Sequence, residues 1–138
     1  MDKALVIIFQ LAVFIFSVMI HEIAHGVVAL RLGDTTAKDA GRLTLNPIKH
    51  LDPIGSIILP LLLATIPGAP IFGWAKPVPY NPFNLKNPKV GAGIIGAAGP
   101  LSNLAMAAVF GLFIRFLPSG IGIEAGGIAI VLFQLIVL

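Results

Sequence analysis

The stretch ALVIIFQLAVFIFSVMIHEIAHGVVAL, residues 4–30, decides the fold expected of this chain. It carries one fixed charge, Glu22, and no proline, so nothing in it interrupts a continuous helix. About 20 apolar residues suffice to cross a hydrocarbon core roughly 30 Å thick, and this stretch is longer. We therefore predict a membrane-spanning helix over residues 4–32.

The composition of the whole chain supports the same environment. Of 138 residues, 57% are hydrophobic and 11% are charged, and the mean hydropathy is +1.00, whereas soluble domains carry about 25% charged residues. Two more apolar stretches predict spans over residues 90–117 and 121–138. We therefore expect residues 1–138 to form one all-α integral membrane domain with about three transmembrane helices, in the cell membrane, with the lipid bilayer as a partner.

Other function classes are excluded by what the chain lacks. It contains no cysteine, which rules out disulfide scaffolds, cysteine-ligated zinc and a thiol nucleophile. The formal net charge of +3 is small and scattered, so no nucleic acid is expected as a partner.

The middle of the chain differs in composition, because nine of the eleven prolines lie in residues 47–88. Residues 54–72 are apolar but broken by prolines, which predicts either a short kinked span or a re-entrant segment. If this segment crosses, the basic residues divide four against five and give no orientation. If it is re-entrant, seven lie on one side, and the positive-inside rule places residues 31–89 in the cytoplasm. We favour the re-entrant alternative.

Chemistry is concentrated within the first predicted span, at His21-Glu22-Ile23-Ala24-His25. Positions i and i+4 share one helix face, so His21 and His25 can bind one zinc ion while Glu22 reaches a water on it. Ionisable groups deep in a membrane are costly and therefore indicate function. The alternatives are hydrogen bonding between helices, or a proton relay in a transporter.

A second motif is the segment AGPLSN, residues 98–103, which follows a run rich in glycine and alanine. The small residues Gly91, Gly93, Gly96 and Gly99 predict a face for close helix approach. At 1.5 Å per residue, Asn103 lies within roughly 5 Å of the membrane depth of His21. Two roles stay open for Asn103, namely helix packing through one hydrogen bond and direct contact with a substrate.

Together these motifs resemble the site-2 proteases, which are intramembrane zinc metalloproteases. The resemblance rests on HEIAHG at 21–26 and AGPLSN at 98–103, and it extends to GDTTA at 33–37, GRLTLNP at 41–47 and FGWAKPVP at 72–79. These segments are similar to the compact bacterial branch of the family and cover nearly the whole chain.

The resemblance implies that His21 and His25 ligate Zn²⁺, that Glu22 is the general base, and that the substrate is a transmembrane protein. It also implies a third, acidic ligand in a further span, which we expect beyond residue 138 in a longer protein. Asp34, His50 and Asp52 are weaker candidates for that ligand. Without a third ligand, we expect this chain alone to cleave no transmembrane substrate at a useful rate.

Two further expectations concern the middle segment and the overall function. Residues 74–81 are expected either to anchor the chain at the membrane interface or to pair with an extended substrate strand. The alternatives to proteolysis are a metal-binding membrane transporter and a non-catalytic membrane scaffold.

Overall fold

The computed structural model describes residues 3–67 and 72–116, and this part of the chain is helical with no β-strand. Its elements in chain order are α1 (Lys3–Arg31), α2 (Thr36–Asp39), η1 (Pro47–Lys49), η2 (Pro53–Ile58), α3 (Leu59–Ala64), η3 (Pro82–Asn84) and α4 (Pro88–Arg115). The elements labelled η1 and η3 are 3₁₀-helical turns, and η2 is a single π-helical segment.

The two long helices agree closely with the predictions over residues 4–32 and 90–117. By length and composition, Ala12–Arg31 of α1 and Pro88–Leu112 of α4 could each cross a membrane. The third predicted span, residues 121–138, lies outside the described residues. The fold class is therefore confirmed as all-helical with two candidate spans.

The end of α1 is set by Gly33. This residue has a φ of 104°, a left-handed conformation that glycine adopts without the penalty of a Cβ atom. The backbone N–H of Asp34 then donates back to Ala29 O at 2.9 Å, which closes the last turn. The chain consequently leaves the helix sharply and enters the loop-rich middle of the molecule.

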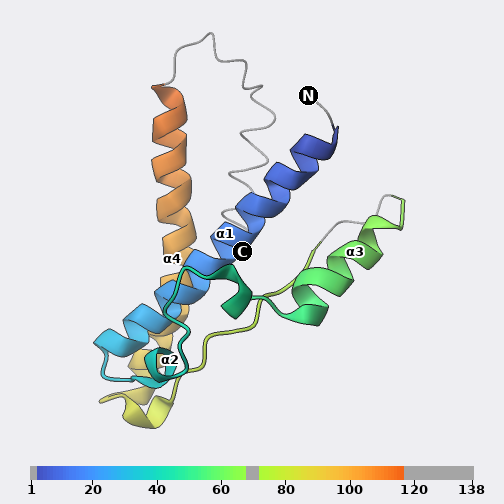
Figure 1. Cartoon of the computed structure of the whole chain (residues 1–138). Helices are drawn as coiled ribbons and strands as arrows, with labels where there is room; N and C mark the ends of the chain where they lie inside the picture. Colours follow the sequence, from blue (N-terminus) through green and yellow to red (C-terminus); the bar gives the residue numbers. More distant parts are fainter. Residues whose placement is uncertain (1–2, 68–71, 117–138) are drawn as a thin grey trace.

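Helices α1 and α4 cross and pack against each other, as Figure 1 shows. Every fourth residue of α4 is buried, which is the spacing of one helix face; these residues are Gly91, Ile95, Gly99, Asn103 and Ala107. Gly93 and Gly96 do not belong to the face that packs on α1. Both are exposed, and a Cβ atom at either position would meet nothing within 4 Å.

The proline-broken segment at residues 54–72 runs outward through η2 and α3, and the chain then comes back (Figure 1). Trp74 N donates to Gly55 O at 3.2 Å, and the Ser56 hydroxyl donates to Trp74 O at 2.7 Å. The segment therefore begins and ends at neighbouring points. This is the geometry that the re-entrant alternative requires.

Candidate metal centre

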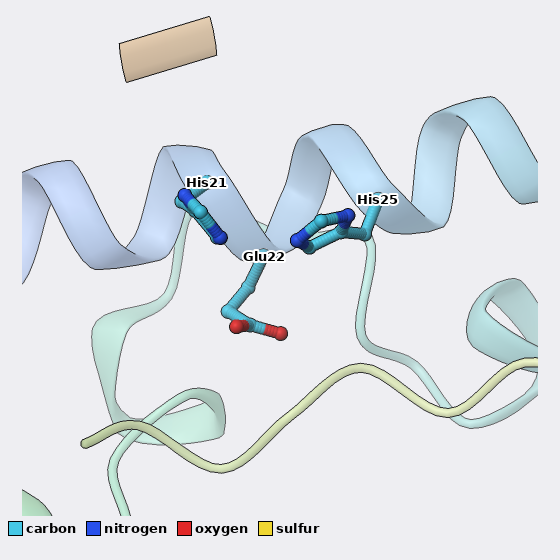
Figure 2. Close-up of side chains that lie close together, drawn as sticks. All are labelled: His21, Glu22 and His25. Carbon is cyan, nitrogen blue, oxygen red and sulfur yellow. The ribbon is translucent and has the colours of Figure 1, made fainter. Parts of the chain in front are cut away.

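Three potential ligands converge on one side of α1, where the His-Glu-x-x-His pattern was expected to place them (Figure 2). One ligand atom from each of His21, Glu22 and His25 lies within 4.8 Å of the others. The two imidazole rings meet edge to face, with centroids 4.7 Å apart and planes at 79°. All three residues are partly buried, so they are shielded by neighbouring elements without being sealed off.

The ring of His25 is fixed by the backbone of α4. Its Nδ1 lies 2.6 Å from Ile95 O. Because a carbonyl oxygen only accepts, Nδ1 carries the hydrogen and Nε2 keeps a free lone pair. This is the tautomer in which a histidine binds a metal through Nε2.

The ring of His21 contacts α4 through a side chain. Its Nδ1 lies 3.1 Å from Asn103 Nδ2, and Asn103 has no exposed surface. The structure thus brings together the motifs at residues 21–25 and 98–103, which were expected to lie at a similar depth in the membrane. Asn103 in turn receives a long hydrogen bond of 3.5 Å from the hydroxyl of buried Ser17, one turn before His21 on α1.

The space facing the two rings is left by a missing side chain on α4. A Cβ atom at Gly99 would collide with Nε2 of His21 and with Nε2 of His25. Both Nε2 atoms therefore lie against the bare backbone of α4, and only a glycine at position 99 leaves room for the two rings. Two imidazole nitrogens and one carboxylate are ligand types that zinc prefers, so these residues fit the ion.

Glu22 extends from α1 toward the extended chain that follows α3 (Figure 2). Its Oε2 accepts a 2.7 Å hydrogen bond from the backbone N–H of Val78. A pocket of about 210 Å³ opens beside this contact, lined by Glu22 and His25 of α1, by Val78 and Tyr80, and by Ile95 of α4. This contact could not be predicted, because a backbone donor 56 residues away leaves no signature in the sequence.

Arg42 holds the segment that carries Val78. The residue is 7% exposed, and its guanidinium donates to the carbonyl oxygens of Lys49, Lys76 and Pro77. These carbonyls belong to two separate parts of the middle region. Arg42 therefore ties the backbone immediately before Val78 to the loop around η1.

Asp34 anchors the other end of the same segment. The carboxylate is fully buried, and it accepts hydrogen bonds from Asn81 N at 2.7 Å and from Asn84 Nδ2 at 2.8 Å. It also accepts from the backbone N–H and hydroxyl of Thr36, at 3.1 and 2.5 Å. Burial alone would raise the pKa of Asp34, but the hydrogen bonds outweigh it and lower the pKa to about 2.

The structure does not bring Asp34, His50 or Asp52 into the candidate centre. Over residues 3–67 and 72–116, His21, Glu22 and His25 form the one group able to hold an ion. The three other residues have local structural contacts. His50 Nε2 lies 2.8 Å from Thr44 O, and the Asp52 carboxylate accepts from Gly55 N at 2.7 Å at the start of η2.

The chain is similar to curated proteins from three bacteria. It is 46% identical over 110 residues to "Putative zinc metalloprotease YwhC" of Bacillus subtilis, a match that covers 80% of this chain and 46% of that protein. It is 32% identical over 102 residues to "Putative zinc metalloprotease Rip2" of Mycolicibacterium smegmatis, and 31% identical to the protein of the same name from Mycobacterium tuberculosis H37Rv. Each of these two matches covers 74% of this chain and 38% of the relative.

The chain thus spans less than half the length of these curated relatives. No protein-family model matches it, and no solved structure does.

Proposed function

Because this chain belongs to the site-2 protease-like family of zinc metalloproteases, we propose that it is the core of an intramembrane zinc protease that hydrolyses peptide bonds of transmembrane substrates. One observation carries the proposal. Ligand atoms of His21, Glu22 and His25 lie within 4.8 Å of one another, and Nε2 of both histidines lies against the bare backbone of Gly99, within a helix long and apolar enough to cross a membrane.

In this proposal His21 and His25 would hold Zn²⁺ through Nε2, and the bound ion would supply Lewis acidity toward the scissile carbonyl and the attacking water. Glu22 removes a proton from the attacking water and delivers it to the nitrogen of the leaving amine. The hydrogen bond from Val78 N to Oε2 stabilises the carboxylate and holds it at the pocket.

The pocket also suggests how a substrate binds. A helical substrate must unwind locally, because its carbonyl groups are otherwise engaged in its own hydrogen bonds. The segment at residues 74–81 is extended, and part of it lines the pocket beside Glu22. These features support the expectation that an unwound substrate strand lies along this segment, although two prolines, Pro77 and Pro79, remove backbone donors there.

The membrane arrangement belongs to the same proposal. We place α1 and α4 across the cell membrane, together with a further span at residues 121–138, and we place residues 31–89 on the cytoplasmic side. The hydrogen bonds from Asn81 and Asn84 to Asp34 support a common side for the end of α1 and the start of α4. The re-entrant alternative for residues 54–72 is supported by the pairing of Trp74 with Gly55.

The test of function compares Glu22→Gln with His21→Ala in the full-length protein. Glu22→Gln should lower cleavage of a transmembrane substrate by roughly 10²–10⁴-fold, because the general base is lost while both histidines remain. Zinc content should stay stoichiometric in this variant and be lost in His21→Ala. Cleavage unaffected by Glu22→Gln would overturn the proposal. If Glu22→Gln abolished metal or proton transport and left cleavage unchanged, the result would favour a transporter.

The test of topology uses two exposed lysines, Lys38 in α2 and Lys86 just before α4. Cysteines introduced at these positions should react with a membrane-impermeant reagent only from the cytoplasmic side. Reaction from opposite sides would mean that residues 54–72 cross the membrane.

A further inference from the structure

Both candidate histidines contact α4 through Nδ1, but the contacting groups differ in kind. His25 meets the backbone carbonyl of Ile95, which has no hydrogen to give. His21 meets the side-chain amide of Asn103, which has both a donor and an acceptor. The hydrogen on His25 is therefore assigned by the backbone, whereas the hydrogen on His21 depends on how the amide is turned.

The two amide orientations have opposite consequences for metal binding. If Asn103 presents Nδ2 to the ring, Nδ1 of His21 accepts and the neutral ring carries its hydrogen on Nε2, where it blocks a ligand bond. If Asn103 presents Oδ1, Nδ1 carries the hydrogen and Nε2 is free. A half-turn of the amide exchanges the two without changing its shape. Nε2 is also the atom that lies against the bare backbone of Gly99.

The surroundings of Asn103 accept either orientation. The residue is fully buried, and an unpaired amide group there would cost about 1–3 kcal/mol. Its far end lies 3.5 Å from the hydroxyl of Ser17, which donates to Oδ1 or accepts from Nδ2. Ser17 therefore completes the pairing of the amide in both orientations.

We propose that Asn103, backed by Ser17, is a positioning residue that presents Oδ1 to Nδ1 of His21 and so frees Nε2 for the metal. The proposal rests on the proposed function and deepens it, because it assigns to Asn103 the role that the Ile95 carbonyl has for His25. Such hydrogen-bond partners fix both the tautomer and the ring orientation of metal-binding histidines.

The test measures zinc affinity by chelator competition on the full chain in detergent, for two variants at one position. Asn103→Asp keeps acceptor oxygens and has no amide donor, so its affinity should stay within about threefold of the original. Asn103→Leu has a similar volume but no acceptor, and its affinity should fall roughly 10- to 100-fold. An equal fall in both variants, or no fall in Asn103→Leu, would overturn the proposal.

Ser17 provides an independent check that applies even if Asn103→Leu does not fold. Ser17→Ala should weaken zinc binding by about threefold in the original chain, because Ser17 helps to orient the amide. It should have no effect in Asn103→Asp, because both carboxylate oxygens are acceptors and the orientation of the group no longer matters. The matched control is Ser102→Ala on α4, whose hydroxyl donates to Gly99 O at 2.7 Å and not to the Asn103 amide. A loss from Ser17→Ala that is the same size in both backgrounds would contradict the coupling.

A spectroscopic measurement reports the tautomer without any activity. In ¹⁵N NMR spectra of the zinc-loaded chain, His21 should show a protonated Nδ1 in the original and in Asn103→Asp. If the full-length protein binds no zinc, the proposed function itself fails. If Asn103→Leu binds zinc with the same affinity as the original, only the role of Asn103 fails.

Discussion

The helix pair α1–α4 and the middle region, residues 32–87, use polar groups in opposite ways. Between the two helices, polar contacts among the described residues are few, and all lie at the candidate centre: Ser17 with Asn103, His21 with Asn103, and His25 with Ile95. In the middle region, buried Arg42 binds three backbone carbonyls, and buried Asp34 accepts from backbone and side-chain donors of Thr36, Asn81 and Asn84.

The helix pair and the middle region therefore have different structural roles. The helix pair brings the metal-binding atoms together through close packing of small residues. The middle region uses charged side chains to hold irregular backbone, and that backbone positions the donor for Glu22. Changes in the helix pair should therefore alter zinc binding first, and changes in the middle region should alter stability and catalysis while zinc stays bound.

The largest effect on zinc is expected from Gly99→Ala. The new methyl group would displace Nε2 of both histidines, so zinc affinity should fall roughly 100-fold. Helix propensity favours alanine over glycine, so helix content should not fall. Chelator competition measures the affinity, and circular dichroism measures the helix content.

The matched control is Gly93→Ala on the same helix, where a Cβ atom would meet nothing within 4 Å. It should bind zinc as the original chain does. Equal affinities for Gly99→Ala and Gly93→Ala would show that the metal does not lie between α1 and α4.

A smaller effect, in the other region, is expected from Arg42→Lys. One ammonium group cannot reach the three carbonyls that the guanidinium holds, so the free energy of unfolding should fall by about 2–3 kcal/mol. Cleavage by the full-length protein should fall as well, because the segment before Val78 is loosened. Zinc affinity should be unchanged.

Arg31→Lys is the matched control, because Arg31 is exposed at the end of α1. Its effect on unfolding should stay within about 0.5 kcal/mol. Loss of zinc from Arg42→Lys would show that the two regions do not act separately.

The sequence predicted the helix pair well because its signals are local and periodic. An apolar run without proline predicts α1, the spacing of His21 and His25 places both rings on one face, and a rise of 1.5 Å per residue places Asn103 near His21. The same periodicity could have identified the correct glycine. Counting back four residues from Asn103 gives Gly99 and excludes Gly96.

The middle region could not be predicted in the same way. Its prolines exclude long helices but do not specify a path. The contact between Val78 and Glu22 uses a backbone N–H, which every residue except proline has, so the side-chain sequence carries no sign of it. The burial of Arg42 and Asp34 could not be predicted either, since it depends on contacts between distant segments.

The smallest effect, and the one with a distinct pH dependence, is expected from Asp34→Asn. An amide replaces one of the two carboxylate oxygens that accept four hydrogen bonds, so at pH 7 the free energy of unfolding should fall by about 1–2 kcal/mol. Asp39→Asn is the control, because Asp39 is exposed and its carboxylate is bonded to Thr35, at 2.7 Å. Its effect should stay within about 0.5 kcal/mol.

The pH dependence follows from the lowered pKa of Asp34, which is about 2 in the folded chain against 3.8 for an unperturbed aspartate. A lowered pKa means that the unfolded chain binds the proton first, so this stabilisation is complete well above pH 3.8 and is lost as the pH falls toward 2. The side-chain amide of the Asp34→Asn variant does not take up a proton in this range. The difference in unfolding free energy between the original chain and Asp34→Asn should therefore be constant from pH 7 to about pH 5 and should shrink below about pH 4. Denaturation in detergent at several pH values measures it, and a difference that persists undiminished at about pH 2.5 would show that the Asp34 contacts do not depend on its charge.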